Sequence, residues 1–318
     1  MGKAVVLGGK GFIGSRLAAF LKEKGYFVRV VDIRDNDDTR EWWSKADEIV
    51  TRDLRNYGDA MLSVRGMDIV FHLAANMGGV GFFTANDYYP FFDNMRMSLN
   101  VLQACEKESV PKLFYSSSAC VYPTHIQRDV KSVPALKEDM IFPANSDQMY
   151  GWEKLMTLML CQRSPVDCRV GIFHTIFGEG QEITGDRVKF PPAIVSKVIE
   201  AKKTGKLKIW GDGSQLRTFL YIEDALNMIH EVVTMPRENY LGPVNIAAEE
   251  VVSVKEIAEH LCSYASIDPE YIYESDKPSG VLARGVDLTR FHSYSPYTHQ
   301  YTTKQGFERL YDYLKDKG

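Results

Sequence analysis

Short apolar runs alternate with amphipathic stretches through the first half of the chain. The apolar runs are rich in β-branched and aromatic residues, as buried strands are, and between them apolar residues recur at helical spacing. Strands that alternate with helices form parallel β-α-β units, so we expect an α/β fold with a doubly wound parallel sheet covered on both faces. The predicted strands are 4–9, 26–32, 67–75, 111–119 and 168–174, and the predicted helices are 14–25, 94–110 and 150–164.

The pattern changes after residue 174. Residues 175–192 are rich in glycine and proline, which predicts a loop, and a helix is predicted over 193–205. We therefore expect a larger domain, a smaller C-terminal α/β domain, and one later segment that returns to the first. The expected ranges are 1–174 with about 219–247 for the larger domain, and 175–218 with 248–318 for the smaller.

Composition and charge exclude several classes of protein. The 318 residues are 45% hydrophobic and 25% charged, as in an ordinary globular protein, and the net charge of −4 argues against binding to nucleic acid. No apolar run approaches the ~18 residues of a membrane span, and the chain enters its first strand without a signal peptide, so we expect a cytoplasmic protein with no membrane partner. The five cysteines are scattered without a C-x-x-C pair, which predicts neither disulfides nor a metal site, and a buried apolar position for most of them.

The segment 8–17, GGKGFIGSRL, places three glycines between a predicted strand and a predicted helix. Gly8 would allow a tight turn, Gly11 would let a pyrophosphate approach the helix N-terminus, and Gly14 would let helix and strand pack closely. Asp32 ends the second strand, where a carboxylate accepts hydrogen bonds from ribose hydroxyls and repels a 2′-phosphate. This context predicts a Rossmann-type domain that binds NAD rather than NADP, although Arg34 could hold a 2′-phosphate.

Asp53 lies in the segment 52–56, RDLRN, after a further stretch that looks like a strand between the predicted strands 26–32 and 67–75. A carboxylate at this edge of the sheet could meet the adenine of the cofactor. It could equally be a loop carboxylate with a structural role.

Tyr150 and Lys154 lie four residues apart in YGWEK and so share one face of a predicted helix. A lysine ammonium near a phenol stabilises the phenolate and lowers the phenol pKa from about 10. Such a phenolate can take a hydroxyl proton while hydride leaves the same carbon. The spacing also occurs by chance on solvated helices, but a dinucleotide motif and the serine-rich strand end before it favour a catalytic role.

The motifs GGKGFIG, FHLAA, SSSACVYP and YGWEK together resemble the extended short-chain dehydrogenase/reductase family of NAD-dependent sugar-nucleotide epimerases and dehydratases, over about residues 3–290. Within that family, AANMGGVGFF, SSACVYP, RVKFPPA and WGDGSQLRTF resemble the GDP-mannose 3,5-epimerases. The 4,6-dehydratases carry a T-D-E triplet where this chain has Ser118-Ala119-Cys120, which argues against a dehydratase.

The resemblance implies an activity and a set of catalytic roles. Tyr150 would be the base when NAD⁺ oxidises C4 of a hexose, Lys154 would be its partner and hold the nicotinamide ribose, and Ser118 would bind the reacting hydroxyl. Cys120 and Lys189 would be the acid–base pair that inverts C3, C5 or both before C4 is reduced again. A ketone at C4 acidifies the hydrogens on both neighbouring carbons, so an inversion there needs a base on one face and an acid on the other.

The resemblance also implies binding residues and partners. The substrate would be a nucleotide-diphosphate sugar, with a GDP-hexose favoured, and the family tendency is a homodimer that pairs the helices 94–110 and 150–164. Thr175 stands where the family usually has asparagine. The further implied cofactor contacts are Phe12, Ile13, Leu54, Leu73, Ala74 and Ala75, and the implied substrate contacts are Gly78, Gly79, Ser118, Thr175, Lys197, Arg217 and Arg284.

Other interpretations stay open on the sequence. Cys120 could be a packing residue, Lys189 a solvated loop lysine, and Arg217 or Arg284 a surface charge. Other candidate activities are a simple NDP-sugar 4-epimerase and a 4-ketoreductase that consumes the nicotinamide cofactor. A non-catalytic dinucleotide-binding regulator is a further alternative, but it would need no Tyr–Lys pair.

Overall fold

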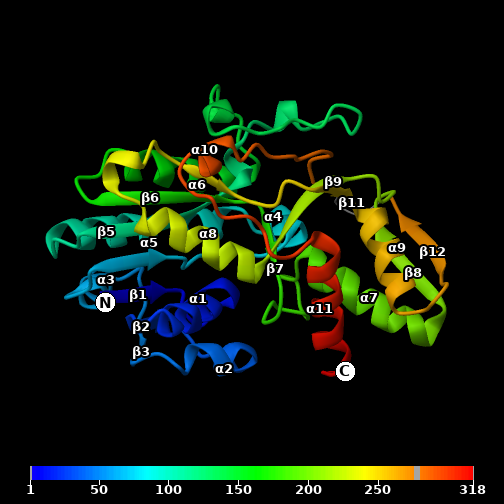
Figure 1. Cartoon of the computed structure of the whole chain (residues 1–318), viewed down its shortest axis with the longest axis horizontal. Coiled ribbons are helices and arrows are strands. Elements are labelled where there is room, and N and C mark those ends of the chain that lie inside the picture. The colour runs from blue at the N-terminus through cyan, green and yellow to red at the C-terminus, as the bar shows by residue number, and fades with distance from the viewer. Residues whose placement is uncertain (1, 276–279, 318) are drawn as a thin grey trace.

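The computed structural model describes residues 2–275 and 280–317. It shows a large sheet layered with helices and, beside it, a smaller group of helices and short strands that carries the C-terminus (Figure 1). The predicted domain ranges include Met1, residues 276–279 and Gly318, which lie outside the described residues. None of the described helices is both long and apolar enough to cross a membrane.

The large sheet has seven strands in the order β10-β6-β5-β4-β1-β2-β3, and the register of every pair is parallel. The predicted α/β fold with a parallel, Rossmann-type sheet is therefore confirmed. The strands are β1 Lys3–Leu7, β2 Phe27–Asp32, β3 Glu48–Thr51, β4 Ile69–His72, β5 Lys112–Ser118, β6 Asp167–Phe173 and β10 Val244–Ile246.

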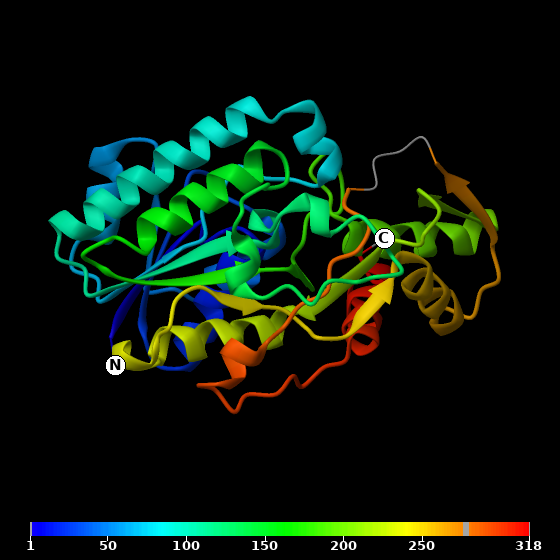
Figure 2. The ribbon, with the colours of Figure 1, turned by 90° about the horizontal axis from the view of Figure 1, so that it is seen from above.

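Helices cover both faces of this sheet. Helices α5 and α6 lie above it and α8 lies below it in Figure 2. Successive side chains of a strand point to opposite faces of the sheet, so each strand contributes to the cores on both faces. Val6 and Val30 belong to one buried core, and Val5 and Val31 belong to the other. This burial on both faces is the reason that the strands are continuous apolar runs. The helices around the sheet are α1 Phe12–Glu23, α2 Arg40–Trp43, α3 Tyr57–Val64, α4 Val80–Ala85, α5 Tyr88–Lys107, α6 Gln148–Cys161, α8 Ile222–Thr234 and α10 Thr289–His292.

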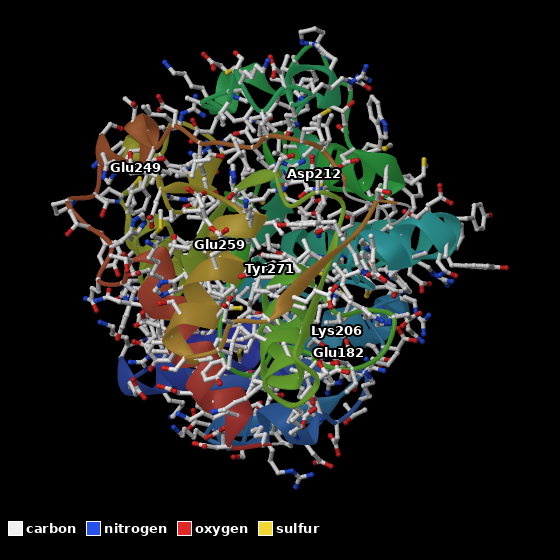
Figure 3. The ribbon with its side chains drawn as sticks, turned by 90° about the vertical axis from the view of Figure 1, so that its right-hand side faces the viewer. Glu182, Lys206, Asp212, Glu249, Glu259 and Tyr271 are labelled. Atoms are coloured by element: carbon white, nitrogen blue, oxygen red, sulfur yellow. The ribbon has the colours of Figure 1, made fainter. Side chains whose placement is uncertain are left out.

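The smaller group contains a three-stranded sheet of order β11-β9-β7 and the strand pair β12-β8. Figure 3 faces this layer, with Tyr271 on β12, Lys206 on β8 and Glu259 on α9 in view. The chain returns from it to the large sheet twice, first through α8 and β10, which pairs with β6, and again at α10. The division into two domains stays a prediction. The elements of this group are β7 Thr175–Phe177, α7 Phe190–Thr204, β8 Lys206–Trp210, β9 Leu216–Tyr221, β11 Val251–Ser253, α9 Val254–Tyr264, β12 Glu270–Glu274 and α11 Thr303–Lys315.

Three predicted boundaries are wrong. Helix α5 begins at Tyr88 rather than at residue 94, with Pro90 in its first turn. The predicted loop 175–192 contains β7, which pairs with β9, and it ends early because α7 already begins at Phe190. Prolines are tolerated in the first turn of a helix, where the backbone N–H groups have no intrahelical partner, so Pro191 and Pro192 start α7 instead of ending a loop.

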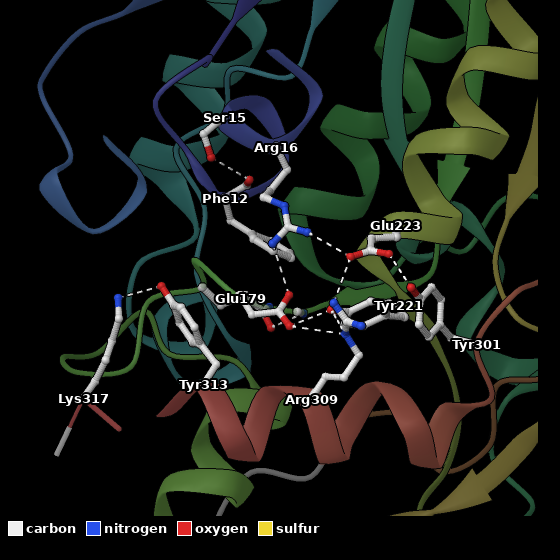
Figure 4. Close-up of polar contacts among 12 residues, drawn as sticks. Phe12, Ser15, Arg16, Glu179, Tyr221, Glu223, Tyr301, Arg309, Tyr313 and Lys317 are labelled. Atoms are coloured by element: carbon white, nitrogen blue, oxygen red, sulfur yellow. Dashed lines mark hydrogen bonds and ion pairs between the residues drawn. The ribbon is translucent and has the colours of Figure 1, made fainter. Parts of the chain in front are cut away.

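A polar network ties the C-terminal helix to α1 and α8, two helices that cover the large sheet (Figure 4). The carboxylate of Glu179 accepts hydrogen bonds from Arg16 on α1, at 3.1 Å, and from the Tyr221 hydroxyl, at 2.6 Å. Arg309 on α11 donates to the same hydroxyl at 2.8 Å and to Glu223 at 3.1 Å. These contacts hold the segment after β7 in place against α1.

Candidate active site

A cavity of about 1130 Å³ opens at the carboxyl ends of β1, β4 and β5, between the large sheet and the smaller group. The strand order reverses between β1 and β4, which is where ligands bind in open parallel sheets. The structure brings all the residues singled out by the sequence to this one cavity. They are Gly8, Gly11, Phe12, Ile13, Gly14, Asp32, Asp53, Leu54, Leu73, Ala74, Ala75, Gly78, Gly79, Ser118, Cys120, Tyr150, Lys154, Thr175, Lys189, Lys197, Arg217 and Arg284.

The glycine turn between β1 and α1 is packed as a dinucleotide site requires. A Cβ atom on Gly14 would lie 2.1 Å from the carbonyl oxygen of Gly8, so only glycine lets α1 approach the turn. Gly8 itself has a φ of +77°. Gly11 is the N-cap of α1 and borders the cavity, so the free N–H groups of the first turn are available to a phosphate.

Asp32 stands at the rim of the cavity with a fixed orientation. Its carboxylate accepts hydrogen bonds from the backbone N–H groups of Lys10, at 3.0 Å, and Ile33, at 2.8 Å. Arg34 is exposed on the same rim. The open helix N-terminus and an oriented carboxylate at the end of β2 fit a dinucleotide whose ribose hydroxyls bind Asp32.

Asp53 also borders the cavity, but its carboxylate is engaged by the chain. Arg55 donates to it through Nη2 at 2.8 Å and reaches Asp93 at 3.3 Å. The hydrogen bonds from Arg55 hold the pKa of Asp53 below its usual value. The structural role is thus present, and a contact with adenine stays a prediction.

Tyr150 and Lys154 are both buried on α6, and the Tyr150 ring stacks on Phe83 at a centroid distance of 4.7 Å. We expected Lys154 to lower the phenol pKa, and this is wrong for the chain itself. Burial raises the pKa of Tyr150 well above its ordinary value, and the nearby Cys120 and Glu153 raise it further. The Lys154 ammonium lies 5.7 Å from the ring centroid, and burial lowers its own pKa.

Cys120 is the one cysteine of the five that is not buried, and the other four are buried as expected. It lies in a short 3₁₀ turn directly after β5, and its N–H donates to the Ser118 hydroxyl at 3.2 Å. Arg284 donates to the thiol through Nη1 at 3.8 Å. The turn thus presents a hydroxyl and a thiol to the same cavity.

Lys189 is the N-cap of α7 and borders the cavity on the side of the smaller group. Its ammonium lies 3.7 Å from the Met77 sulfur. Burial lowers the pKa of Lys189, while Cys120 acts in the opposite direction. A buried lysine with a lowered pKa can act as a proton acceptor. The two side chains are close enough to influence one another electrostatically.

Gly78 and Gly79 border the cavity, and their expected contact with a sugar stays a prediction, but the space that a Cβ atom would fill is occupied by the chain. A Cβ atom on Gly78 would lie 2.7 Å from Phe82, and one on Gly79 would lie 2.5 Å from the carbonyl oxygen of Val188. Arg187 closes this contact by donating to the Met77 carbonyl at 2.8 Å. These glycines therefore allow the segment that carries Lys189 to pack against the end of β4.

The expected phosphate-binding cations differ in how free they are. Arg217 donates to the carbonyls of Leu216 and Leu282 at 2.8 and 3.3 Å, and burial lowers its pKa to about 9. Arg284 donates to Gln127 at 2.6 Å in addition to its contact with Cys120. The chain thus engages Arg217, whereas Nη2 of Arg284 is buried without a hydrogen-bond partner among the described residues, 3.6 Å from Asp147.

Lys197 lies on α7, with its ammonium 5.3 Å from the centroid of the Trp210 ring, and burial lowers its pKa. Thr175 begins β7, where it pairs with Phe219. Both residues border the cavity on the side of the smaller group.

Comparison with known proteins agrees with this site. Residues 4–247 match the NAD dependent epimerase/dehydratase family. The chain belongs to this family. NAD is the cofactor of the family, and the predictions of an NAD-dependent enzyme of the nucleotide-sugar epimerase type and of an extended short-chain dehydrogenase/reductase are confirmed.

The chain is similar to two plant GDP-mannose 3,5-epimerases and to a solved 4-epimerase structure. GDP-mannose 3,5-epimerase 1 of Oryza sativa subsp. japonica is 33% identical over 98% of this chain and 81% of that enzyme. GDP-mannose 3,5-epimerase of Arabidopsis thaliana is 32% identical over 99% of this chain and 82% of that enzyme. The crystal structure of UDP-glucose 4-epimerase from Thermotoga maritima has a TM-score of 0.85 at 22% identity, covers 99% of each chain, and shares the fold.

The sequence did not assign roles to several residues that the structure places at the family site. Phe83 stacks on the tyrosine, Arg187 joins two cavity segments, and Glu153 lies beside the lysine. All three lie inside motifs that the sequence analysis singled out. Spacing along the chain gave no signal for them, because each acts through a contact with another element.

Proposed function

We propose that this chain is an NAD-dependent epimerase of the GDP-mannose 3,5-epimerase type. It would oxidise C4 of the hexose, invert C3, C5 or both, and reduce C4 again. The observation that carries the proposal is the presence of Cys120 and Lys189 in the same cavity as Tyr150, Lys154 and Ser118. A simple oxidation at C4 has no use for a second acid–base pair.

The Tyr150 end of the site would perform the oxidation. NAD, when bound, supplies the hydride acceptor and donor for C4. Tyr150 would take the proton of the C4 hydroxyl, which Ser118 orients, and Lys154 would bind the nicotinamide ribose. Because burial raises the pKa of Tyr150, the positive charges of Lys154 and of the bound cofactor are needed to stabilise the phenolate.

The Cys120–Lys189 pair would perform the inversion. With a ketone at C4, one member removes the proton from the neighbouring carbon and the other returns a proton to the opposite face. The lowered pKa of Lys189 suits it to accept a proton, and the thiol of Cys120 suits the return. A free thiol in this role favours a reducing, cytoplasmic setting, and all five cysteines are free.

The substrate would be a nucleotide-diphosphate sugar, with GDP-mannose as the first candidate. Lys197 and Trp210 border the end of the cavity in the smaller group, where a cation and an aromatic ring suit a phosphate and a base. The identity of about one third to the plant GDP-mannose 3,5-epimerases supports the guanine nucleotide.

The proposal is tested by incubating the purified protein in D₂O with GDP-, UDP-, CDP- and dTDP-hexoses and locating deuterium by NMR. We expect label at C3, C5 or both of GDP-mannose, with no net change in nicotinamide absorbance. Inversion at C4 without solvent label would instead indicate a 4-epimerase. Stoichiometric oxidation of reduced cofactor would indicate a ketoreductase, and no turnover with any sugar would favour a regulator.

We also propose that the protein is a homodimer through α5 and α6. Three apolar side chains on α6, Trp152, Met156 and Leu160, are 38–45% exposed and recur at helical spacing, and Phe92 on the neighbouring α5 is 54% exposed. Two such helices from each copy would form a four-helix interface.

Replacing Met156 with glutamate is expected to convert a dimer into a monomer, because a charge would be buried at the centre of the interface. Light scattering on the purified variant measures the mass. Tyr273→Glu on β12, in the smaller group on the other side of the molecule (Figure 1), is the matched control and should keep the dimer mass. A wild-type protein that is monomeric at micromolar concentration would refute the interface.

A further inference from the structure

A buried carboxylate lies directly behind the Tyr–Lys pair. Glu153 has an exposed fraction of 0%, and its Oε1 accepts hydrogen bonds from the Tyr115 hydroxyl at 3.2 Å and from the Thr157 hydroxyl at 3.4 Å. Its Oε2 has no hydrogen-bond partner among the described residues and faces the Lys154 ammonium at 3.9 Å. One oxygen is thus anchored to β5 and α6, and the other is directed at the lysine.

Lys154 needs such a partner because it is almost completely enclosed. Its side chain is 3% exposed, and its ammonium lies 4.9 Å from the ring centroid of Tyr115. Burial lowers the pKa of Lys154, and Glu153 is the strongest influence in the opposite direction. A buried ammonium without a counter-charge loses its proton, whereas a paired one keeps it.

The same carboxylate acts on the tyrosine in the opposite sense, because its negative charge raises the pKa of Tyr150. Other titratable groups also surround Lys154, and those that raise its pKa do so less than Glu153 does. The surrounding groups are His72 on β4, whose pKa burial lowers to about 3, Tyr115 on β5, Cys120 after β5, Tyr150 and Cys161 on α6, and Lys189 at the start of α7.

We propose that Glu153 is a positioning residue of the catalytic pair: its buried carboxylate holds Lys154 in place as a charged ammonium, ready to bind the cofactor ribose and to stabilise the phenolate. The role of Lys154 in turnover rests on the proposed function, but its role toward the cofactor does not. Glu153 does not line the cavity, so it acts through the residues beside it, and its effect on binding of the cofactor ribose runs through Lys154.

The test is the pH dependence of NAD⁺ binding, measured by titration calorimetry on the wild type and on Glu153→Gln. The amide keeps the shape and can still accept from Tyr115 and Thr157, but it lacks the charge. We expect equal affinities at low pH, where Lys154 is protonated in both proteins. The pH above which NAD⁺ binding weakens should be about one unit lower in Glu153→Gln than in the wild type. Above the wild-type transition, the variant should therefore bind NAD⁺ ~10-fold more weakly than the wild type.

Tyr115→Phe is the matched control, since it removes a hydrogen bond to the same carboxylate and leaves the charge. Its pH dependence should equal that of the wild type. The proposal is overturned if Glu153→Gln binds NAD⁺ with the wild-type pH dependence, or if Tyr115→Phe shifts it equally. The result is independent of the sugar, so a failure to turn over GDP-mannose would count against the proposed function and not against this role.

A second variant covers the case in which Glu153→Gln does not fold. The double variant Lys154→Met with Glu153→Gln contains no buried charge at either position, so we expect it to fold. Its unfolding temperature should be higher than that of Lys154→Met alone. If the double variant is less stable than Lys154→Met, Glu153 is needed for packing rather than for its charge, and the proposal fails.

Discussion

Replacing Cys120 with alanine is expected to abolish the inversion of GDP-mannose, with a loss of about 10²- to 10⁴-fold in the rate at which deuterium-labelled, inverted sugar appears. The thiol is the proposed acid of the inversion, and Lys189 alone cannot serve both faces of the same carbon. NMR of the sugar recovered from D₂O measures the label. Removal of the Lys189 amine in Lys189→Met should have the same effect.

Two observations separate a loss of inversion from a general loss of function. The Cys120→Ala variant should still oxidise C4, which a transient rise in nicotinamide absorbance would report, because Tyr150 and Lys154 are unchanged. Cys262→Ala, at a buried cysteine on α9 that does not border the cavity, should incorporate label at the wild-type rate. Inversion at the wild-type rate by Cys120→Ala would eliminate the thiol from the mechanism.

The Gly14→Ala substitution is expected to damage both the fold and cofactor binding. The added Cβ would lie 2.1 Å from the backbone oxygen of Gly8, and neither backbone can move without separating α1 from β1. Forced overpacking of this kind costs about 3 kcal/mol. Denaturant unfolding measures the stability, and titration with NAD⁺ should show a loss of affinity that exceeds 10-fold, because the helix N-terminus is displaced from the pyrophosphate site.

Two other glycines provide controls of graded severity. A Cβ on Gly11 would come no closer than 3.3 Å, to the oxygen of Gly8, so Gly11→Ala should fold with little loss of stability and still bind NAD⁺ more weakly. A Cβ on Gly81 would meet nothing within 4 Å, so Gly81→Ala should leave the stability unchanged. Equal behaviour of Gly14→Ala and Gly81→Ala would show that the turn is not packed as described.

Much of the site could be predicted because the glycine turn and the Tyr–Lys pair are each local in sequence. The turn needs glycine at fixed spacing for steric reasons, and i, i+4 spacing places two side chains on one helical face, so short motifs report both. Cys120 was located in the same way, at the end of a predicted strand. Lys189 came from the resemblance, since its position in the structure depends on the packing of α7.

The electrostatic interpretation could not be obtained in that way. The sequence placed an ammonium near a phenol and so predicted a lowered pKa for Tyr150, but the pKa of a buried group depends on the loss of hydration, which only the folded chain specifies. The same holds for Glu153, whose charge matters because it is enclosed beside Lys154. It also holds for Gly79, whose missing Cβ makes room for Val188.

The sequence by itself determined the parallel sheet and the glycine turn, because strand burial and backbone sterics act over a few residues, and its motifs named the candidate catalytic side chains. Tertiary structure alone decided which of these side chains meet. It brought Lys189 at the start of α7 to the cavity that the thiol after β5 also borders, engaged Arg217 and Arg284 with the chain, and placed Glu153 behind Lys154. These contacts join segments far apart in the chain, and their energies depend on burial, which no local pattern encodes.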